Sequence, residues 1–228
     1  MPNTLPAHKL SFYTVPKCGC TSIKNFFFEI ENGYVFQPYR VNGQRITIHQ
    51  VHRSIPFERL STEGEEGYTK IAVVRDPVAR LISCYESKVL GGGHLKSEPV
   101  LRFLREKRLT SEPDLETFVD NLAKYQRASK MILRHSSPLS MYLGSDAAWF
   151  DKLFDISEMN EMKAFVEKRI GKTANLPHRN LSKKKVDPSE ISGGLRDKIR
   201  SMFKEDIAIF GEWIKFTNAK NSQDILVN

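Results

Sequence analysis

The sequence predicts an α/β fold with a mainly parallel central sheet flanked by helices. Two short apolar runs, at residues 9–15 and 68–74, are typical of buried strands, and each is followed by a tight loop and an amphipathic helix. A third apolar run, at residues 153–156, also precedes a helix. Strands that alternate with helices favour parallel pairing, and such sheets bind ligands at the carboxyl ends of their strands.

Length and composition are those of a globular chain. With 228 residues and 26.2 kDa, we expect one domain over residues 1–228. The 40% hydrophobic and 10% aromatic content excludes disorder over most of the length. No window approaches the roughly 18 consecutive apolar residues of a membrane span, and the first ten residues lack the apolar stretch of a secretory signal. We therefore expect a cytoplasmic protein without a membrane span, or a chain from which a targeting segment has been removed.

The charge balance favours anionic partners. The chain has 35 basic and 27 acidic residues, giving a net charge of +8, which does not choose among nucleic acid, nucleotide, acidic glycan and membrane surface. The three cysteines Cys18, Cys20 and Cys84 form an odd set that fits a reducing compartment. The pair at positions 18 and 20 lacks a second Cys/His pair at zinc-site spacing, so we expect no metal.

The first strand, at residues 9–15, ends at Pro16, and a helix follows. Thr21 or Ser22 is expected to cap this helix, and Gly33 to end it. Its apolar face has the i, i+3, i+4, i+7 spacing of Ile23, Phe26, Phe27 and Ile30.

Alternating residues predict a second strand at 45–51, and polar residues predict a turn at 61–67. The strongest strand signal, residues 68–74, ends at Arg75, and Pro77 suits the first position of the next helix. The apolar face of that helix repeats the spacing of the first, with Val78, Leu81, Ile82 and Tyr85.

Beyond a flexible break at 91–93 the pattern is mostly helical. Helices are expected at 100–107, 113–133, 158–170 and 195–210, and a core strand at 153–156. Ser157 is the expected cap of the helix at 158–170, Gly171 its end, and residues 175–185 form a basic loop.

The loop after the first strand has the composition of a phosphate cradle. Lys17 supplies a positive charge, Gly19 lets the backbone approach a ligand, and Thr21 and Ser22 add hydroxyl donors at a helix start. It is not a Walker A loop, because Lys17 precedes the only glycine. An alternative is an ordinary capped helix after a turn.

The loop after the strongest strand also suits an anion. Arg75 at the end of a parallel strand can hold phosphate with its planar fork, and Ser83 lies about two turns into the helix. The alternative is that Arg75 pairs with Asp76 or a surface acid and Ser83 faces solvent. Two such loops together favour a ligand with phosphate-like groups at two separated places.

These two segments resemble a known family. P-K-C-G-C-T-S at 16–22 is similar to the 5′-phosphosulfate loop of sulfotransferases that use 3′-phosphoadenosine 5′-phosphosulfate (PAPS), and V-V-R-D-P-V-A-R-L-I-S-C-Y at 73–85 to their 3′-phosphate motif. The resemblance is greatest to the carbohydrate branch, which includes Golgi enzymes and bacterial relatives. It covers residues 9–31 and 68–90, and implies a P-loop-like three-layer fold. The lack of a membrane anchor points to a bacterial-type soluble form.

The resemblance implies a role for each loop residue. The 5′-phosphosulfate is expected to contact a set of first-loop residues: Lys17, Cys18, Gly19, Cys20, Thr21 and Ser22. Arg75 and Ser83 would hold the 3′-phosphate, with PAP as product and no metal required. Two cysteines flank Gly19 where the family has varied small residues, so the cradle is expected to survive but to be sensitive to oxidation.

Sulfuryl transfer to a hydroxyl needs charge stabilisation and a general base. Lys17 is expected to neutralise the bridging oxygen as the S–O bond breaks. Some carbohydrate 2-O-sulfotransferases carry a catalytic His before the 3′-phosphate strand, and His52 in Q-V-H-R-S is similar in placement. His52 is therefore the expected base, with His49 second; a structural histidine bonded to backbone is the alternative for each.

The acceptor is expected to be a hydroxyl-bearing molecule, a carbohydrate or glycoconjugate. The basic loop at 175–185 resembles a segment that covers the nucleotide in this branch, and otherwise is a solvated turn. A rim for an acidic acceptor is suggested by charge alone, from Arg45, Arg53 and Lys88.

The alternatives to a sulfotransferase are a nucleotide kinase and a nucleic-acid-binding module. A P-loop-like nucleotide kinase requires a Walker Lys-Ser/Thr pair and a magnesium-binding Asp, and neither is found in the right place. A basic nucleic-acid-binding module requires exposed aromatics among basic residues, whereas Phe26, Phe27 and Tyr85 fall on apolar helix faces. We therefore expect an enzyme that does not bind nucleic acid.

Overall fold

The computed structural model describes residues 2–177, 186 and 191–217. The chain divides into two compact units, which we call the sheet unit and the helical unit. The sheet unit comprises Met1–Arg75, Leu139–Leu181 and Ala208–Lys215, and the helical unit comprises Asp76–Pro138, Ser182–Ile207 and Phe216–Asn228. A single domain over residues 1–228 stays a prediction.

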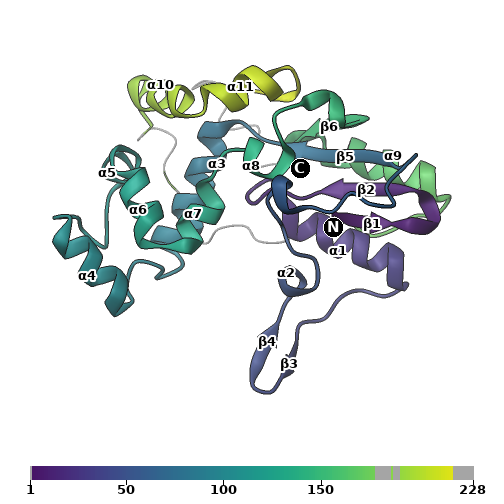
Figure 1. The fold of residues 1–228 in the computed structure, drawn as a ribbon, viewed down its shortest axis with the longest axis horizontal. Helices are drawn as coiled ribbons and strands as arrows, with labels where there is room; N and C mark the ends of the chain where they lie inside the picture. Colours follow the sequence, from purple (N-terminus) through teal and green to yellow (C-terminus); the bar gives the residue numbers. More distant parts are fainter. Residues whose placement is uncertain (1, 178–185, 187–190, 218–228) are drawn as a thin grey trace. The chain divides into compact units, whose positions relative to one another are not determined.

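A four-stranded sheet forms the centre of the sheet unit, in the order β1-β2-β5-β6 (Figure 1). The strands are β1 (Asn3–Leu5), β2 (Leu10–Tyr13), β5 (Thr69–Val74) and β6 (Lys152–Asp155). β5 pairs in parallel with both β2 and β6, and β1 is an antiparallel edge strand. The predicted mainly parallel α/β fold is therefore confirmed, and only β1 was not expected.

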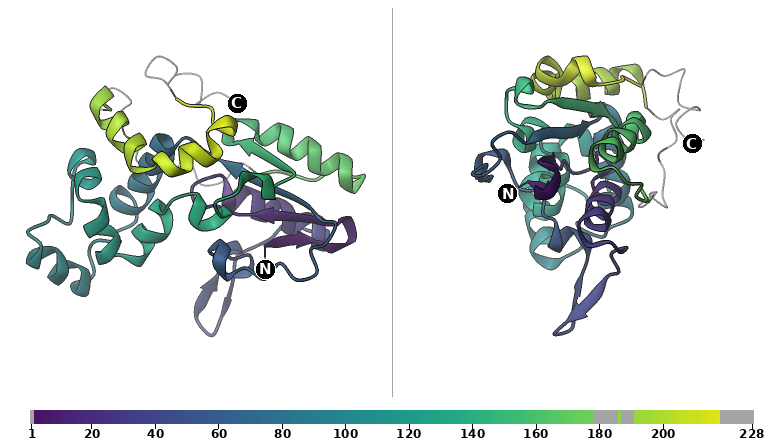
Figure 2. Two further views of the ribbon diagram at one scale, coloured as in Figure 1. Left: turned by 45° about the horizontal axis from the view of Figure 1, so that its top comes forward. Right: turned by 90° about the vertical axis from the view of Figure 1, so that its right-hand side faces the viewer.

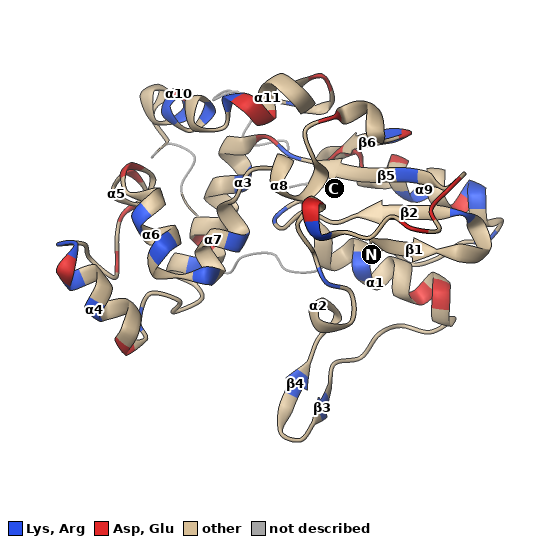
Figure 3. Cartoon of the chain, viewed as in Figure 1, with Lys and Arg blue, Asp and Glu red and all other residues tan. Residues whose placement is uncertain are grey.

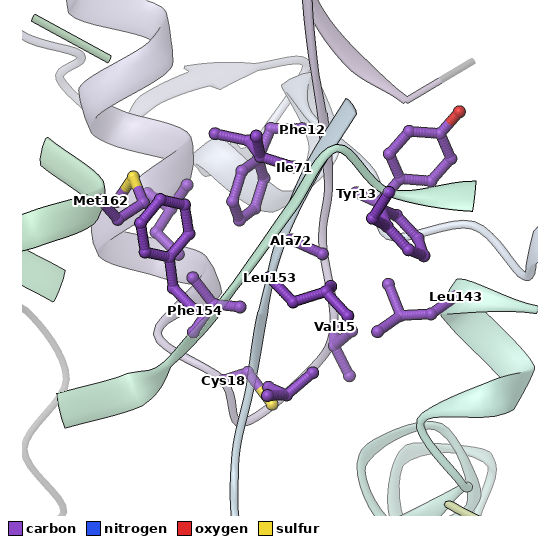
Figure 4. Packing of buried hydrophobic residues seen from close by; sticks show 14 of the residues in the cluster. Phe12, Tyr13, Val15, Cys18, Ile71, Ala72, Leu143, Leu153, Phe154 and Met162 are labelled. Atoms are coloured by element: carbon purple, nitrogen blue, oxygen red, sulfur yellow. The ribbon is translucent and has the colours of Figure 1, made fainter. Parts of the chain in front are cut away.

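Alternate residues of the strands build two layers of core. Phe12 packs on Phe27 of α1 (Cys20–Asn32), with ring centroids 5.3 Å apart, and Phe154 packs on α9 (Met159–Ile170). Tyr13 points to the other face, where its ring meets Phe150 at 5.2 Å. Figure 4 shows these two sets of side chains on either side of the strands. Helices and loops thus cover both faces of the sheet.

Two predicted helix caps are wrong. α1 begins at Cys20, and its N-cap is Gly19 with a left-handed backbone, so Thr21 and Ser22 lie inside the first turn. Before α9, Asp155 caps the short turn Ile156–Glu158 in place of Ser157, accepting from the Ser157 N–H at 2.9 Å. In both cases the chain turns into the helix earlier than the first hydroxyl residue suggests.

The predicted strand at 45–51 is also wrong. β3 (Tyr39–Val41) and β4 (Gln44–Ile46) form a separate antiparallel hairpin, and residues 48–51 form the short helix α2 (Ile48–Val51). Thr47 and Gln50 form a capping box that starts α2, because the Gln50 side chain accepts from the Thr47 N–H at 2.9 Å. We call residues 33–53 the arm. Figure 2 shows its hairpin extending away from the sheet in two further views.

The helical unit contains the helix that follows β5. α3 (Pro77–Cys84) begins at the predicted proline, with the Asp76 side chain accepting from the Val78 N–H at 3.0 Å, and it continues into a π-helical turn, Tyr85–Leu90. The expected helix at 113–133 is three helices, because Asn121 and Ser129 interrupt it. The remaining α-helices among the described residues, in either unit, are α4 (Glu98–Glu106), α5 (Leu115–Asp120), α6 (Leu122–Ala128), α7 (Lys130–Ser136), α8 (Ser140–Leu143), α10 (Gly193–Met202) and α11 (Lys204–Phe210).

The helical unit has its own core, in which Phe118 and Tyr125 are completely buried, and the Phe118 ring contacts the rings of both Tyr85 and Tyr125. Within the described part of the chain, every helix is too short or too polar to span a bilayer.

Candidate functional site

The first loop and Arg75 lie together at the carboxyl edge of the sheet. β2 and β5 are adjacent and parallel, so the segments that follow them emerge on the same side. The Arg75 guanidinium crosses to the first loop and donates from Nη1 to the Lys17 carbonyl oxygen at 3.1 Å. Arg75 therefore braces the loop that contains Lys17.

The backbone of the first loop is tightly turned. Both Lys17 and Gly19 have a left-handed backbone, with φ of 70° and 67°. For a residue other than glycine this conformation costs about 1–2 kcal/mol. The Cys18 N–H donates to the Val15 carbonyl at 3.3 Å, and the Cys18 side chain is buried in the core (Figure 4). These contacts and the Arg75 bond hold the loop in its strained shape.

The loop ends at the N-terminus of α1, a helix of 13 residues. A helix leaves its first N–H groups without partners inside the helix, and its dipole adds a partial positive charge there. Cys20, Thr21 and Ser22 form this first turn. The structure therefore combines a helix N-terminus, a lysine and an arginine, which suits a phosphate or sulfate oxyanion.

The arm contacts α1 through His49. α2 is anchored by Ile48, which is buried with Phe28 and Phe36. From this position the exposed His49 places its Nε2 2.9 Å from the Thr21 Oγ1 and its Nδ1 3.5 Å from the Lys24 Nζ. Although the predicted strand is wrong, His49 thus contacts a residue of the first turn of α1.

His52 lies at the end of α2 and is half-buried. Its ring meets the Phe28 ring edge-on, with centroids 6.2 Å apart, and its Nε2 is buried with no hydrogen-bond partner among the described residues. Burial lowers the pKa of His52 below its ordinary value, and the Lys24 charge lowers it further. His52 is therefore neutral at pH 7.

Lys24 is the site residue that the sequence did not reveal. Its side chain is only 1% exposed, and its Nζ donates to the Ser54 Oγ at 2.9 Å. The Ser54 Oγ lies 2.9 Å from the Thr14 Oγ1, on the loop after β2. In the sequence, one pattern indicates that Lys24 is buried: Lys24 and Asn25 lie between apolar residues of α1. Buried Lys24 therefore links α1 to the arm through His49, and to the loop after β2 through Ser54 and Thr14.

The remaining predicted residues belong to other elements of the chain. Ser83 is on α3 of the helical unit, as is Lys88 in the π-helical turn. Arg45 is on β4 of the arm and Arg53 follows α2. Of the predicted lid at 175–185, residues 178–185 lie outside the described residues. Among the residues that are described, no group of three or more His, Cys, Asp or Glu side chains could hold a metal ion.

Comparison with known proteins gave one match. The profile of the sulfotransferase family matches residues 3–211, which is most of the chain and includes both loops and the arm. Comparisons with curated proteins and with solved structures each found no significant match.

Proposed function

The chain belongs to the sulfotransferase family, and on that premise we propose that it transfers a sulfuryl group from PAPS to a hydroxyl of a carbohydrate or glycoconjugate. The bracing of the first loop by Arg75 carries this proposal, because it brings the Arg75 guanidinium to the backbone of Lys17, just before a helix N-terminus, at one edge of the sheet. PAPS has anionic groups at two places and would supply the sulfuryl group. No step requires a metal.

The described residues fit such a donor. Lys17, the backbone of Cys18 and Gly19, and the first turn of α1 would hold the 5′-phosphosulfate. The first turn consists of Cys20, Thr21 and Ser22. Arg75 would hold the 3′-phosphate, and a contact of Ser83 with the same group stays a prediction. The Cys18 side chain is in the core, so only its backbone can take part.

Two residues would act on the reacting groups. Lys17 would place its ammonium at the bridging oxygen and stabilise the charge that develops there as the S–O bond breaks. His52 would accept the acceptor hydroxyl proton at Nε2. A lowered pKa favours the neutral ring, and in the tautomer with its proton on Nδ1 the lone pair of Nε2, which has no partner among the described residues, is open to a new bond. Because Nε2 is covered, we expect acceptor binding to move the side chains around it.

The arm supports a carbohydrate acceptor. Tyr34 and Tyr39 are 63% and 51% exposed, and flat aromatic faces stack on sugar rings. Between Gly33 and Phe57 there is no acidic residue, whereas Arg40, Arg45 and Arg53 are basic. Figure 3 shows the basic positions on β3 and β4. An exposed surface with tyrosines and arginines suits a polar, hydroxyl-rich acceptor with negative charge.

The donor is tested by thermal stabilisation and by transfer. We expect PAP to raise the melting temperature without magnesium, and label from PAPS to appear on members of a carbohydrate panel. Lys17→Ala should abolish both effects, while the matched Lys168→Ala, in the last turn of α9, should retain them. Stabilisation by ATP with magnesium only, or by an oligonucleotide with steep salt dependence, would instead indicate a kinase or a nucleic-acid-binding module.

A further inference from the structure

We propose that His49 is a positioning residue, which Lys24 holds in one tautomer so that His49 orients the hydroxyl of Thr21 for the anion at the first loop. The role of Thr21 toward the anion rests on the proposed function. The tautomer itself does not, because it follows from contacts within the sheet unit.

Lys24 supplies the hydrogen-bond donors that hold His49. A lysine ammonium has three N–H donors and no acceptor. One of its hydrogens goes to the Ser54 Oγ at 2.9 Å, and the Ser54 Oγ in turn lies 2.9 Å from the Thr14 Oγ1. Lys24 therefore presents another N–H to the His49 Nδ1, 3.5 Å away.

This contact decides which nitrogen of His49 carries the proton. The Nδ1 that faces an ammonium must be the acceptor, because two N–H groups cannot point at each other. A neutral imidazole has one donor and one acceptor, so the proton lies on Nε2. Nε2–H then donates to the Thr21 Oγ1 at 2.9 Å.

This tautomer of His49 determines the direction of the Thr21 hydroxyl hydrogen. The Thr21 oxygen accepts from His49, so its own hydrogen points away from the imidazole and acts as a donor on another side. Thr21 lies in the first turn of α1, where the helix N-terminus attracts an anion. His49 thus fixes the direction of a donor at the proposed 5′-phosphosulfate position. With Nδ1 against Lys24 and Nε2 protonated, His49 is not the general base.

Nitrogen-15 NMR of the full chain tests the tautomer without donor or acceptor. The His49 signals are assigned by their loss in His49→Gln. We expect a protonated Nε2 and an unprotonated Nδ1 for His49 between pH 7 and pH 8. A protonated Nδ1, an imidazolium, or an equal mixture of tautomers would overturn the proposal. Failure of the sulfotransferase assay would leave this result unaffected.

A pair of substitutions tests the positioning role. Gln can place its amide N–H near the position of the His49 Nε2–H, while Ala cannot. We expect His49→Ala to weaken PAP binding and raise the KM for PAPS about 3- to 10-fold, and His49→Gln to restore most of that loss. If His49 were the base, both variants would lose kcat equally, and the proposal would fail.

The matched control is His8→Gln. His8 precedes β2, at the opposite edge of the sheet from the first loop, so its variant should bind PAP like the wild-type chain. PAP titration separates the two proposals. If the wild-type chain does not bind PAP, the proposed function fails while the NMR result still decides the tautomer. If PAP binds and His49→Ala binds it as tightly as the wild-type chain, the positioning role is refuted.

Discussion

Because Arg75 forms a hydrogen bond to the first loop, we expect the substitution Arg75→Lys to weaken PAP binding strongly. Arg75→Lys keeps the positive charge but removes the planar fork that reaches the Lys17 carbonyl at 3.1 Å. A hydrogen bond to a charged group contributes about 1.5–3 kcal/mol, and Lys17 has a left-handed backbone that costs about 1–2 kcal/mol to maintain. Without the bond, the loop can relax this strain and lose its shape.

Loss of that bond alone corresponds to a rise in the Kd for PAP of about 10- to 100-fold. Isothermal titration calorimetry at fixed salt measures it. The matched control is Arg169→Lys on α9, because Arg169 also donates to a backbone carbonyl, that of His8 at 3.0 Å, at the other edge of the sheet. The reasoning is refuted if Arg75→Lys binds PAP within about two-fold of the wild-type chain, or if Arg169→Lys weakens binding equally.

Three further predictions concern the base, the loop and the core. His52→Ala should bind PAP normally and lose about 10²- to 10⁴-fold in turnover; because the pKa of His52 is lowered, wild-type turnover should fall on acidification only below about pH 6.5. Gly19→Ala should lower the melting temperature, since φ is 67° there and the new Cβ would meet Met159 at 3.4 Å. Tyr13→Phe should reduce the free energy of unfolding by about 1–3 kcal/mol, because the Tyr13 hydroxyl donates to the buried Glu65 carboxylate at 2.8 Å.

Each of these three predictions has an outcome that would contradict it. Full turnover in His52→Ala, or a midpoint of the acid limb above the ordinary histidine pKa, would move the base assignment elsewhere. Unchanged melting in Gly19→Ala would mean that the loop tolerates another backbone shape. Its control is Gly194→Ala, because Gly194 lies outside the left-handed region and its new Cβ would meet no atom within 4 Å. An equal urea midpoint in Tyr13→Phe would show that Glu65 finds another donor.

The sheet was predictable because its strands are short, apolar and followed by clear helix patterns. β5 reads as buried on both faces, and Pro77 marks the start of α3. β1 was missed because three residues between prolines carry no period that distinguishes a strand from a tail.

The arm shows why short alternating runs mislead. The residues of Arg45–Val51 alternate like a strand, but the Thr47–Gln50 capping box starts a helix in the middle of the run. Ser129 breaks the predicted helix at 113–133 in the same way, since its side chain caps α7. Hydrogen bonds between a side chain and the nearby backbone set the starts of both α2 and α7. Over so few residues, such bonds outweigh the periodicity of the apolar residues.

The grouping of the first loop and Arg75 at one edge of the sheet was predictable, but the packing behind them was not. Lys17, Thr21 and Arg75 follow from their positions at strand ends, which any parallel sheet brings to one edge. Lys24 and Ser54 are 30 residues apart and meet only in three dimensions. A lysine on α1 looks like a solvated residue until the arm covers it, so no pattern in α1 alone could assign it.

The anchoring of the arm limits where this protein can tolerate change in length. α2 has its own cap and its own buried Ile48, so His49 stays against Thr21 whatever the hairpin does. The turn at Asn42 and Gly43 has left-handed backbone at both residues and is exposed. Residues added at that tip would extend the surface that we propose for the acceptor and leave the contact between His49 and Thr21 in place.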